Sequence, residues 1–326
     1  MRAAAAPSDF SRHGGRIAAA RAAFPEAPHP WLDLSTGINP QPYPARPVTL
    51  AERGRLPDPE AVRALEAQAA AAFGADPPAV AAVPGSEAAI RLLPRLLPAR
   101  HVAIAASTYG GHAESWRAAG AEVVREPGEA EAWVVVNPNN PDGAITPPET
   151  LRRSAAERWT LVDEAFADLR PELSLASEAG GRLIVLRSFG KFFGLAGVRL
   201  GFVVAEPSLA AEVRAWFGDW PLGADAIAAG LQAYADPDWA ARARRQLAQT
   251  AARLDRTLAA AGLAPASGTD LFRLVETPRA PAVFRRLAAA GVLCRPFADT
   301  PRLRFGLPGR RADFRRLAAA LTGDPR

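Results

Sequence analysis

The stretch "RSFGKFFGLAGVRLG", residues 187–201, contains Lys191, which is the one lysine among the 39 basic residues of the chain. A single lysine in a composition biased toward arginine and alanine can be a chance remainder. It can also be there because arginine cannot replace it. A guanidinium stays protonated, whereas a lysine amine can lose its proton and form a Schiff base with an aldehyde. The second interpretation makes Lys191 a candidate covalent catalyst, to be tested against its neighbours.

The residues around Lys191 suit a cofactor that carries both an aldehyde and a phosphate. The apolar run at 182–188 predicts a buried strand that ends just before Lys191. Ligands of open α/β sheets bind at the carboxyl ends of strands. Ser188 and Arg199 flank the lysine, and an arginine can hold a phosphate with two hydrogen bonds.

Two further polar side chains follow predicted strands. Asp163 lies in "LVDEAF" and Asn140 lies in "NPNNPDG". A buried carboxylate at Asp163 can pair with a protonated pyridine nitrogen and make the ring an electron sink. Its alternative role is to cap the next helix. Asn140 can donate a hydrogen bond to a ring oxygen, although Asn, Pro and Gly in this segment also suit a plain turn.

A predicted turn and an aromatic residue complete the candidate site. "PGSEAAI", residues 84–90, places Gly85, Ser86 and Glu87 at the start of a helix. Helix N-terminal amides bind phosphate readily, and Ser before Glu is also a common helix start. Tyr109, in "STYGGHAES" after another predicted strand, can stack on a flat ring.

Short apolar runs alternate with helical runs through the middle of the chain, after a first helix expected at 58–74. The runs that predict strands cover residues 79–84, 101–106, 121–126, 132–137, 159–165, 182–188 and 199–206. Buried strands that alternate with helices predict an α/β fold with a mostly parallel sheet, covered on both faces.

The rest of the chain predicts a smaller domain and an arm. A long helical stretch at about 223–262 precedes a different alternation of strands and helices, typical of a smaller α+β domain. Residues 1–50 are rich in Pro and Gly and are expected to be irregular. The predicted division is an N-terminal arm at 1–50, a large cofactor-binding domain at 51–222, and a linking helix with a small C-terminal domain at 223–326.

Composition excludes several classes of protein. The chain has 326 residues, of which 49% are hydrophobic and 22% charged, as in a globular protein of one large and one small domain. No apolar run reaches the ~20 residues of a membrane span, and the N-terminus has no secretory signal, so a cytoplasmic enzyme is expected. The single cysteine, Cys294, excludes an internal disulfide, and the four histidines are scattered, so no metal site is expected. The net charge of +5 is spread over many segments, which favours anionic small substrates over nucleic acid.

The motifs occur in the order found in one known family. "NPNNPDG", "DEAF", "SFGKFFGLAGVRLG" and "RLRFGL" resemble the fold-type I, aspartate-aminotransferase-like pyridoxal-phosphate enzymes over most of the chain. The resemblance implies pyridoxal 5′-phosphate as the cofactor, Lys191 as its Schiff-base lysine and a homodimer. It implies that Tyr109 covers the ring, Asn140 binds the ring oxygen and Asp163 binds the ring nitrogen. The residues it implies for the phosphate are Gly85, Ser86, Glu87, Ser188 and Arg199.

The N-terminal segments narrow the resemblance. "HGG" at 13–15, "DLSTGINPQPYP" at 33–44 and "RLPDPEAVRALE" at 55–66 resemble the threonine-phosphate decarboxylases of cobalamin biosynthesis, relatives of the histidinol-phosphate aminotransferases. This implies decarboxylation of L-threonine O-3-phosphate to (R)-1-amino-2-propanol O-2-phosphate and carbon dioxide. The substrate residues it implies are Arg304 for the carboxylate, and His13, Ser35, Thr36 and Asn39 where such enzymes close over the substrate.

The sequence also departs from the family at three positions. Phe166 and Leu56 stand where many relatives have tyrosine, and Asp142 replaces a common threonine. Because Phe166 cannot donate a hydrogen bond, Asn140 is expected to carry the ring-oxygen contact more nearly alone. Two alternatives remain: an aminotransferase that uses the same residues on histidinol phosphate, and a non-catalytic cofactor-binding module. The chain shows no helix-turn-helix segment of the kind usually fused to such a module.

Overall fold

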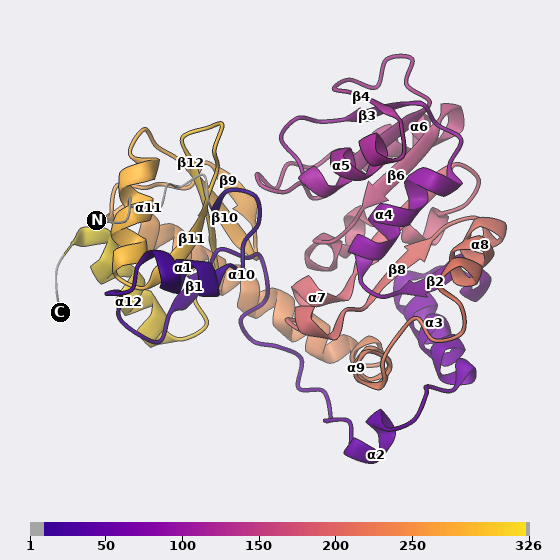
Figure 1. The fold of residues 1–326 in the computed structure, drawn as a ribbon, viewed down its shortest axis with the longest axis horizontal. Coiled ribbons are helices and arrows are strands. Elements are labelled where there is room, and N and C mark those ends of the chain that lie inside the picture. Colours follow the sequence, from indigo (N-terminus) through magenta and orange to yellow (C-terminus); the bar gives the residue numbers. More distant parts are fainter. Residues whose placement is uncertain (1–9, 324–326) are drawn as a thin grey trace. The chain divides into compact units, whose positions relative to one another are not determined.

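A computed structural model describes residues 10–323 of the chain. Its contacts group these residues into two compact units (Figure 1). The larger unit is Pro42–Ala241, and the smaller unit combines the described residues up to Gln41 with those from Arg242 onward. The units therefore meet along the chain at 41/42 and 241/242, whereas the sequence placed domain boundaries at 50/51 and 222/223. The division expected from the sequence stays a prediction.

The larger unit is built on a seven-stranded sheet with the order β2-β8-β7-β6-β5-β3-β4. Strands β3 to β7 pair in parallel, and β8 runs antiparallel to both β2 and β7. This confirms the predicted α/β fold with a mostly parallel sheet. The strands are β2 Val80–Val83, β3 His101–Ile104, β4 Glu122–Val124, β5 Ala132–Val136, β6 Trp159–Asp163, β7 Leu183–Ser188 and β8 Gly201–Val204.

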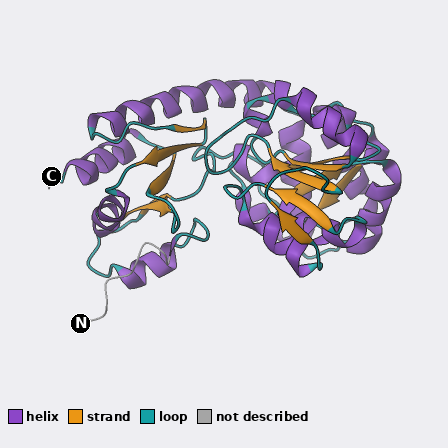
Figure 2. Cartoon of the chain, turned by 90° about the horizontal axis from the view of Figure 1, so that it is seen from above, coloured by secondary structure: helices purple, strands orange, loops and turns teal. Residues whose placement is uncertain are grey.

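Helices cover both faces of this sheet (Figure 2), and its central strands are buried. Local sequence explains where the helices begin and end. The Asp58 side chain accepts a hydrogen bond from the Glu60 backbone N–H at the start of α3, and Gly74 ends that helix in the left-handed region. The helices of this unit are α2 Leu50–Arg53, α3 Pro59–Phe73, α4 Ser86–Leu96, α5 Gly110–Ala118, α6 Pro148–Glu157, α7 Phe189–Phe192, α8 Pro207–Phe217 and α9 Ala224–Tyr234.

The smaller unit has a five-stranded sheet with the order β1-β11-β12-β10-β9. Its strands are β1 Leu32–Leu34, β9 Ser267–Thr269, β10 Phe272–Glu276, β11 Val292–Pro296 and β12 Arg302–Gly306. Its helices are α1 Ile17–Ala23, α11 Ala280–Ala289 and α12 Arg311–Thr322, with the later residues of α10 Pro237–Ala260. The free cysteine, Cys294, is buried in β11.

Two expectations for regular structure need correction. Residues 17–23 and 32–34 are not irregular: they form α1 and β1, because β1 pairs in parallel with β11, far along the chain. The helical stretch at 223–262 is two helices, since α10 begins anew at Pro237, a residue tolerated in the first turn of a helix. Among the described residues, no helix is long and apolar enough to cross a membrane.

Candidate active site

A cavity of about 300 Å³ lies in the larger unit, where β5, β6 and β7 end. Every residue that the sequence suggested for the cofactor lines it. The lining residues are Gly85, Ser86, Glu87, Ile90, Tyr109, Val136, Asn140, Asp163, Ala165, Phe166, Ser188, Gly190, Lys191, Ala196, Arg199 and Leu200. Within residues 10–323, no three His, Cys, Asp or Glu side chains are grouped as a metal would require.

One end of the cavity is suited to an anion. Gly85 adopts a φ of +83°, and a Cβ there would lie 2.5 Å from the nearest guanidinium nitrogen of Arg199. Gly201 allows β8 to pass close by, since its Cβ would lie 2.4 Å from the backbone nitrogen of Ser86. The guanidinium therefore lies over the turn that opens α4. Amides of a helix N-terminus and a guanidinium together are a phosphate-binding arrangement.

Asp163, which also lines the cavity, is held by a histidine that the sequence analysis missed. Its Oδ2 lies 2.9 Å from Nε2 of His112, and its Oδ1 accepts a hydrogen bond from the Ala165 N–H at 3.1 Å. The side chains of His112 and Asp163 are 1% and 4% exposed. A buried carboxylate needs such partners, and this one also faces the cavity, beyond any role as a cap. His112 follows Tyr109 by three positions in "STYGGHAES", which was its only signal in the sequence.

The asparagines of "NPNNPDG" divide between the turn and the cavity. The Asn137 amide exchanges two hydrogen bonds with the Thr146 backbone, at 3.1 and 3.0 Å. Asn139 donates to the Ser107 carbonyl and to Asp142, which also accepts from the Ala144 N–H. Asn140 instead lines the cavity. The turn interpretation therefore explains two of the asparagines and Asp142, while Asn140 is the one that lines the cavity.

A second polar cluster lies beside the site residues of β6 and β7. Arg187 and Glu164 are the chain neighbours of Ser188 and Asp163, and they form a buried ion pair at 2.8 Å. Arg187 also contacts Asp168 and stacks 4.7 Å from the centre of the Phe73 ring. Burial alone would lower the pKa of Arg187, but Asp168 and Glu164 raise it above its usual value. This cluster ties together the strands that end at the cavity.

The residues suggested for substrate gather in the smaller unit. Arg304 is buried and donates to the Ser35 carbonyl at 2.9 Å. The Ser35 hydroxyl accepts from the Gly15 N–H at 2.7 Å. Asn39 is buried and accepts from a backbone N–H, Thr36 is half-buried, and His13 is exposed. These residues form one group around Ser35 and Arg304.

Arg295 belongs to the same group; with Arg302 it is near Arg304 in sequence and could compete for its role. It faces Arg304 in the register of β11 and β12, and it donates to the carbonyls of Ser11 and Arg12. Burial, with a contribution from Arg295, lowers the pKa of Arg304 to about 9. A buried guanidinium so destabilised would gain from an incoming anion.

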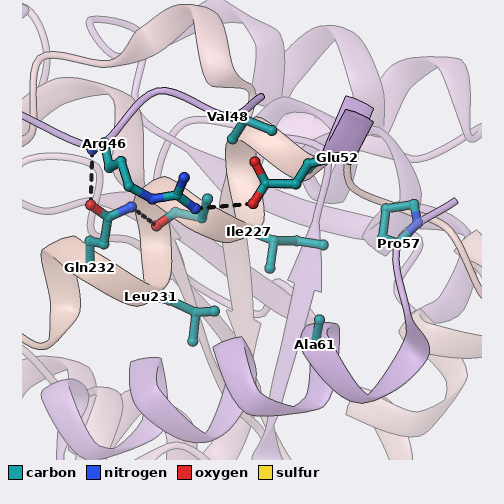
Figure 3. Close-up of a pocket in the computed structure, with 10 residues that line it drawn as sticks. Arg46, Val48, Glu52, Pro57, Ala61, Ile227, Leu231 and Gln232 are labelled. Atoms are coloured by element: carbon teal, nitrogen blue, oxygen red, sulfur yellow. Dashed lines mark hydrogen bonds and ion pairs between the residues drawn. The ribbon is translucent and has the colours of Figure 1, made fainter. Parts of the chain in front are cut away.

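A second, more apolar pocket of about 390 Å³ lies in the larger unit, away from these residues (Figure 3). It is formed by the segment 46–61 and one face of α9. Arg46 bridges the two: its N–H donates to Gln232 at 2.9 Å and its guanidinium pairs with Glu52 at 3.0 Å. Leu56, which belongs to this segment, is 69% exposed.

Comparison with known proteins adds to this geometry. The sequence model of the aminotransferase class I and II family matches residues 49–321. The chain is 45% identical to a threonine-phosphate decarboxylase of Sinorhizobium sp. and 40% identical to one of Pseudomonas aeruginosa. Each alignment covers 95% of this chain and 97% of the relative. The solved structure of histidinol-phosphate aminotransferase from Sinorhizobium meliloti, in complex with pyridoxal-5′-phosphate, matches with a TM-score of 0.80 at 22% identity, over 89% of both chains.

Proposed function

The chain belongs to the class I and II aminotransferase family, and from this premise we propose that it is a pyridoxal-phosphate-dependent decarboxylase of L-threonine O-3-phosphate. The products are (R)-1-amino-2-propanol O-2-phosphate and carbon dioxide. The observation that carries the choice of reaction is the pair of relatives named threonine-phosphate decarboxylase, at 45% and 40% identity over 95% of the chain. The likeness at 22% identity to a histidinol-phosphate aminotransferase supports the fold alone.

The cavity lining suits two parts of the cofactor, its phosphate and its ring nitrogen. Gly85, Ser86 and Arg199 form an anion cradle in which any side chain at position 85 would meet the guanidinium. Asp163, buried and held by His112, offers a carboxylate for the ring nitrogen. A volume of about 300 Å³ is at the lower end of the ~300–1,000 Å³ of small-molecule sites, which suits a single ring with a phosphate.

Each residue that lines or supports the cavity has its own role in the proposed reaction. When bound, pyridoxal phosphate supplies an electron sink for the pair of electrons released as the bond from Cα to the carboxylate breaks. Asp163 stabilises positive charge at the ring nitrogen, and His112 keeps that carboxylate in place. The Lys191 amine would hold the cofactor, and once displaced by substrate it is the candidate donor of the proton to Cα. Phe166 closes the cavity wall without a hydroxyl, which leaves the ring oxygen to Asn140.

Recognition of the substrate is assigned to the smaller unit. The substrate carries two anions, a carboxylate and a phosphate. Arg304 is proposed for the carboxylate, because a buried guanidinium binds a carboxylate through two parallel hydrogen bonds. The phosphate requires other donors, and the donors proposed are His13, Ser35, Thr36 and Asn39.

We assign the chain to the cytoplasm, as a homodimer that acts in cobalamin biosynthesis. The apolar pocket of Figure 3, with the exposed Leu50 and Leu56 in the segment that borders it, supports a covering subunit. Exposed apolar side chains beside an apolar groove usually mark an interface. The cobalamin pathway is proposed because two relatives are named threonine-phosphate decarboxylase and the N-terminal segments resemble the decarboxylases of that pathway.

The test is to incubate purified protein and pyridoxal phosphate with threonine phosphate, without any keto acid, and to measure carbon dioxide. Release of carbon dioxide at many turnovers is expected. An aminotransferase would instead need a keto acid and would leave the carboxylate in place. Turnover that depends on a keto acid, with no carbon dioxide, would overturn the proposal. A lack of both activities would favour the non-catalytic module.

A further inference from the structure

Tyr109 lines two cavities in the larger unit. It lines the cofactor cavity, and it also lines a second cavity, distinct from the apolar pocket of Figure 3, that has a volume of about 390 Å³ and is formed by β3, β4 and α5. Thr108, Arg117 and Val124 are among the residues of that second cavity. Close packing normally fixes an aromatic side chain. Tyr109 is half-buried and packs against the hydrophobic core only in part, so other contacts are needed to hold its ring where a cofactor ring would stack.

Three contacts hold the Tyr109 ring in place. The Tyr109 hydroxyl donates to Glu87 Oε2 at 2.9 Å. The ring lies against Gly111, where a Cβ would approach Tyr109 Cε1 to 2.5 Å. The His112 ring meets it edge to face, with the centroids 6.0 Å apart. Glu87 is itself fixed, since its Oε1 accepts from Arg91 Nε at 2.8 Å.

Glu87 lies at the helix start where the cofactor phosphate would also bind. It lies in the first turn of α4, beside the backbone amides that would hold a phosphate. A carboxylate is favourable there in the empty protein, but it repels a second anion. Arg91, one turn along the helix, offsets that repulsion. These contacts indicate that the role of the carboxylate is to hold the Tyr109 hydroxyl.

We propose that Glu87 is a positioning residue, which with Arg91 and Gly111 holds the Tyr109 ring ready to stack on the cofactor. This inference rests on the proposed use of the cavity for pyridoxal phosphate. The ordinary alternative is that Glu87 and Arg91 form a helix-surface ion pair, which contributes only to stability. The two differ in whether removal of the carboxylate moves the ring.

The first experiment compares two neutral variants, so that the effect of charge on the phosphate cancels. Glu87→Gln keeps an acceptor for the tyrosine hydroxyl, and Glu87→Leu removes it. Fixing one side chain is worth ~0.5–1.5 kcal/mol on binding, so Glu87→Leu should bind pyridoxal phosphate about two- to tenfold more weakly than Glu87→Gln. Its visible circular dichroism, which reports the asymmetry around the cofactor ring, should also change. In a Tyr109→Phe background the two variants should not differ.

Matched controls separate position from stability. Glu60 is also a first-turn acid paired with an arginine of its own helix, at 3.4 Å, so Glu60→Gln and Glu60→Leu should bind the cofactor equally. Gly110→Ala and Gly111→Ala both add a methyl group to α5. The methyl at 110 meets nothing within 4 Å, whereas the one at 111 meets the ring. Only Gly111→Ala should change the circular dichroism, although both favour the helix.

A readout without cofactor keeps the inference separate from the proposed function. With three tyrosines in the chain, fluorine NMR of protein labelled with fluorotyrosine gives one assignable signal for Tyr109. That signal should shift in Glu87→Leu and Gly111→Ala, but not in the controls. If the natural protein binds no pyridoxal phosphate, the proposed function fails while this signal still tests the contacts. An unchanged Tyr109 signal in Glu87→Leu, or equal cofactor binding by Glu87→Leu and Glu87→Gln, would overturn the inference.

Discussion

At the scale of the residue, Lys191 offers a direct chemical test. It lies in α7, which follows β7, and it lines the cavity. Reduction of the yellow holoenzyme with borohydride should attach the cofactor to the peptide that contains Lys191, and Lys191→Ala should lose that attachment. Because the chain has no other lysine, peptide mapping has only the N-terminal amine as a competing position. A label found there, or nowhere, contradicts the assignment.

Substitutions of Asp163 and His112 should lower kcat by different amounts. Asp163→Asn removes the charge that faces the ring nitrogen, and one such electrostatic contact is commonly worth ~3–4 kcal/mol, or two to three decades in kcat. His112→Leu leaves the carboxylate but removes its 2.9 Å partner, so its loss should be smaller. Both variants should still bind cofactor, as checked by absorbance. A near-normal kcat for Asp163→Asn would mean that the carboxylate only supports the local turn.

Arg304 should dominate recognition of the substrate carboxylate. Loss of one partner of a buried charge pair costs ~2 kcal/mol or more, so Arg304→Leu should raise KM at least about thirtyfold. Arg302→Leu is the matched control, since Arg302 lies two positions away on the same strand and is occupied with Thr300. If Arg302→Leu raises KM and Arg304→Leu does not, the alignment with the family is shifted by two residues.

Individual site residues could be found in the sequence where they follow strands. Asp163 and Ser188 end β6 and β7, and Asn140 follows β5, so apolar periodicity was enough to place them at one edge of the sheet. His112 could not be found in this way, and Arg295 could be named only as an arginine near Arg304 in sequence that could compete for its role. His112 contacts Asp163 across 51 positions, and Arg295 faces Arg304 only through the register of two strands. No local pattern encodes such contacts.

At the scale of the element, helix caps and prolines in the sequence predicted where helices begin and end, whereas strand pairings between distant segments could not be predicted. Asp58 and Gly74 bound α3 as the sequence indicated. β1, with three residues, has too little alternation to be recognised, and it is a strand because β11 completes it. The N-terminal segment was therefore expected to be irregular, although residues 10–41 belong to the smaller unit.

The N-terminal segment before α1 should set the preference for a phosphorylated substrate. Phe10 packs on Phe284 at 5.4 Å, so deletion of the segment would expose the core, and a point change is the cleaner test. His13→Ala should remove a donor to the phosphate. Hydrogen bonds to charged groups are worth ~1.5–3 kcal/mol, so kcat/KM for threonine phosphate should fall about ten- to a hundredfold, with no change for threonine.

The control is His101→Ala, which removes another exposed histidine, in the larger unit. It should leave both rates of carbon dioxide release unchanged. An unchanged preference in His13→Ala would mean that "HGG" is only a turn. It would also transfer the recognition of the phosphate to other residues around Ser35 and would give weight to the aminotransferase alternative.

At the scale of the whole molecule, the exposed apolar surface predicts association. Leu50 and Leu56 are 84% and 69% exposed, and both belong to the segment that borders the apolar pocket of Figure 3. Burial of a leucine contributes ~1.5–3 kcal/mol, and a residue at a twofold interface is buried twice. Leu56→Asp should therefore weaken self-association by at least a hundredfold, because it also adds a charge that must be desolvated.

Sedimentation of the natural chain and of two variants measures the strength of self-association. The natural chain should sediment as a dimer and Leu56→Asp as a monomer at the same concentration. Ile145→Asp is the control, since Ile145 is 43% exposed but lies outside the pocket lining, and it should leave the dimer intact. If Leu56→Asp stays dimeric, the segment 46–61 is not the interface. If the natural chain is a monomer, no second subunit covers the segment 46–61, and the cavity must work with the residues of one chain.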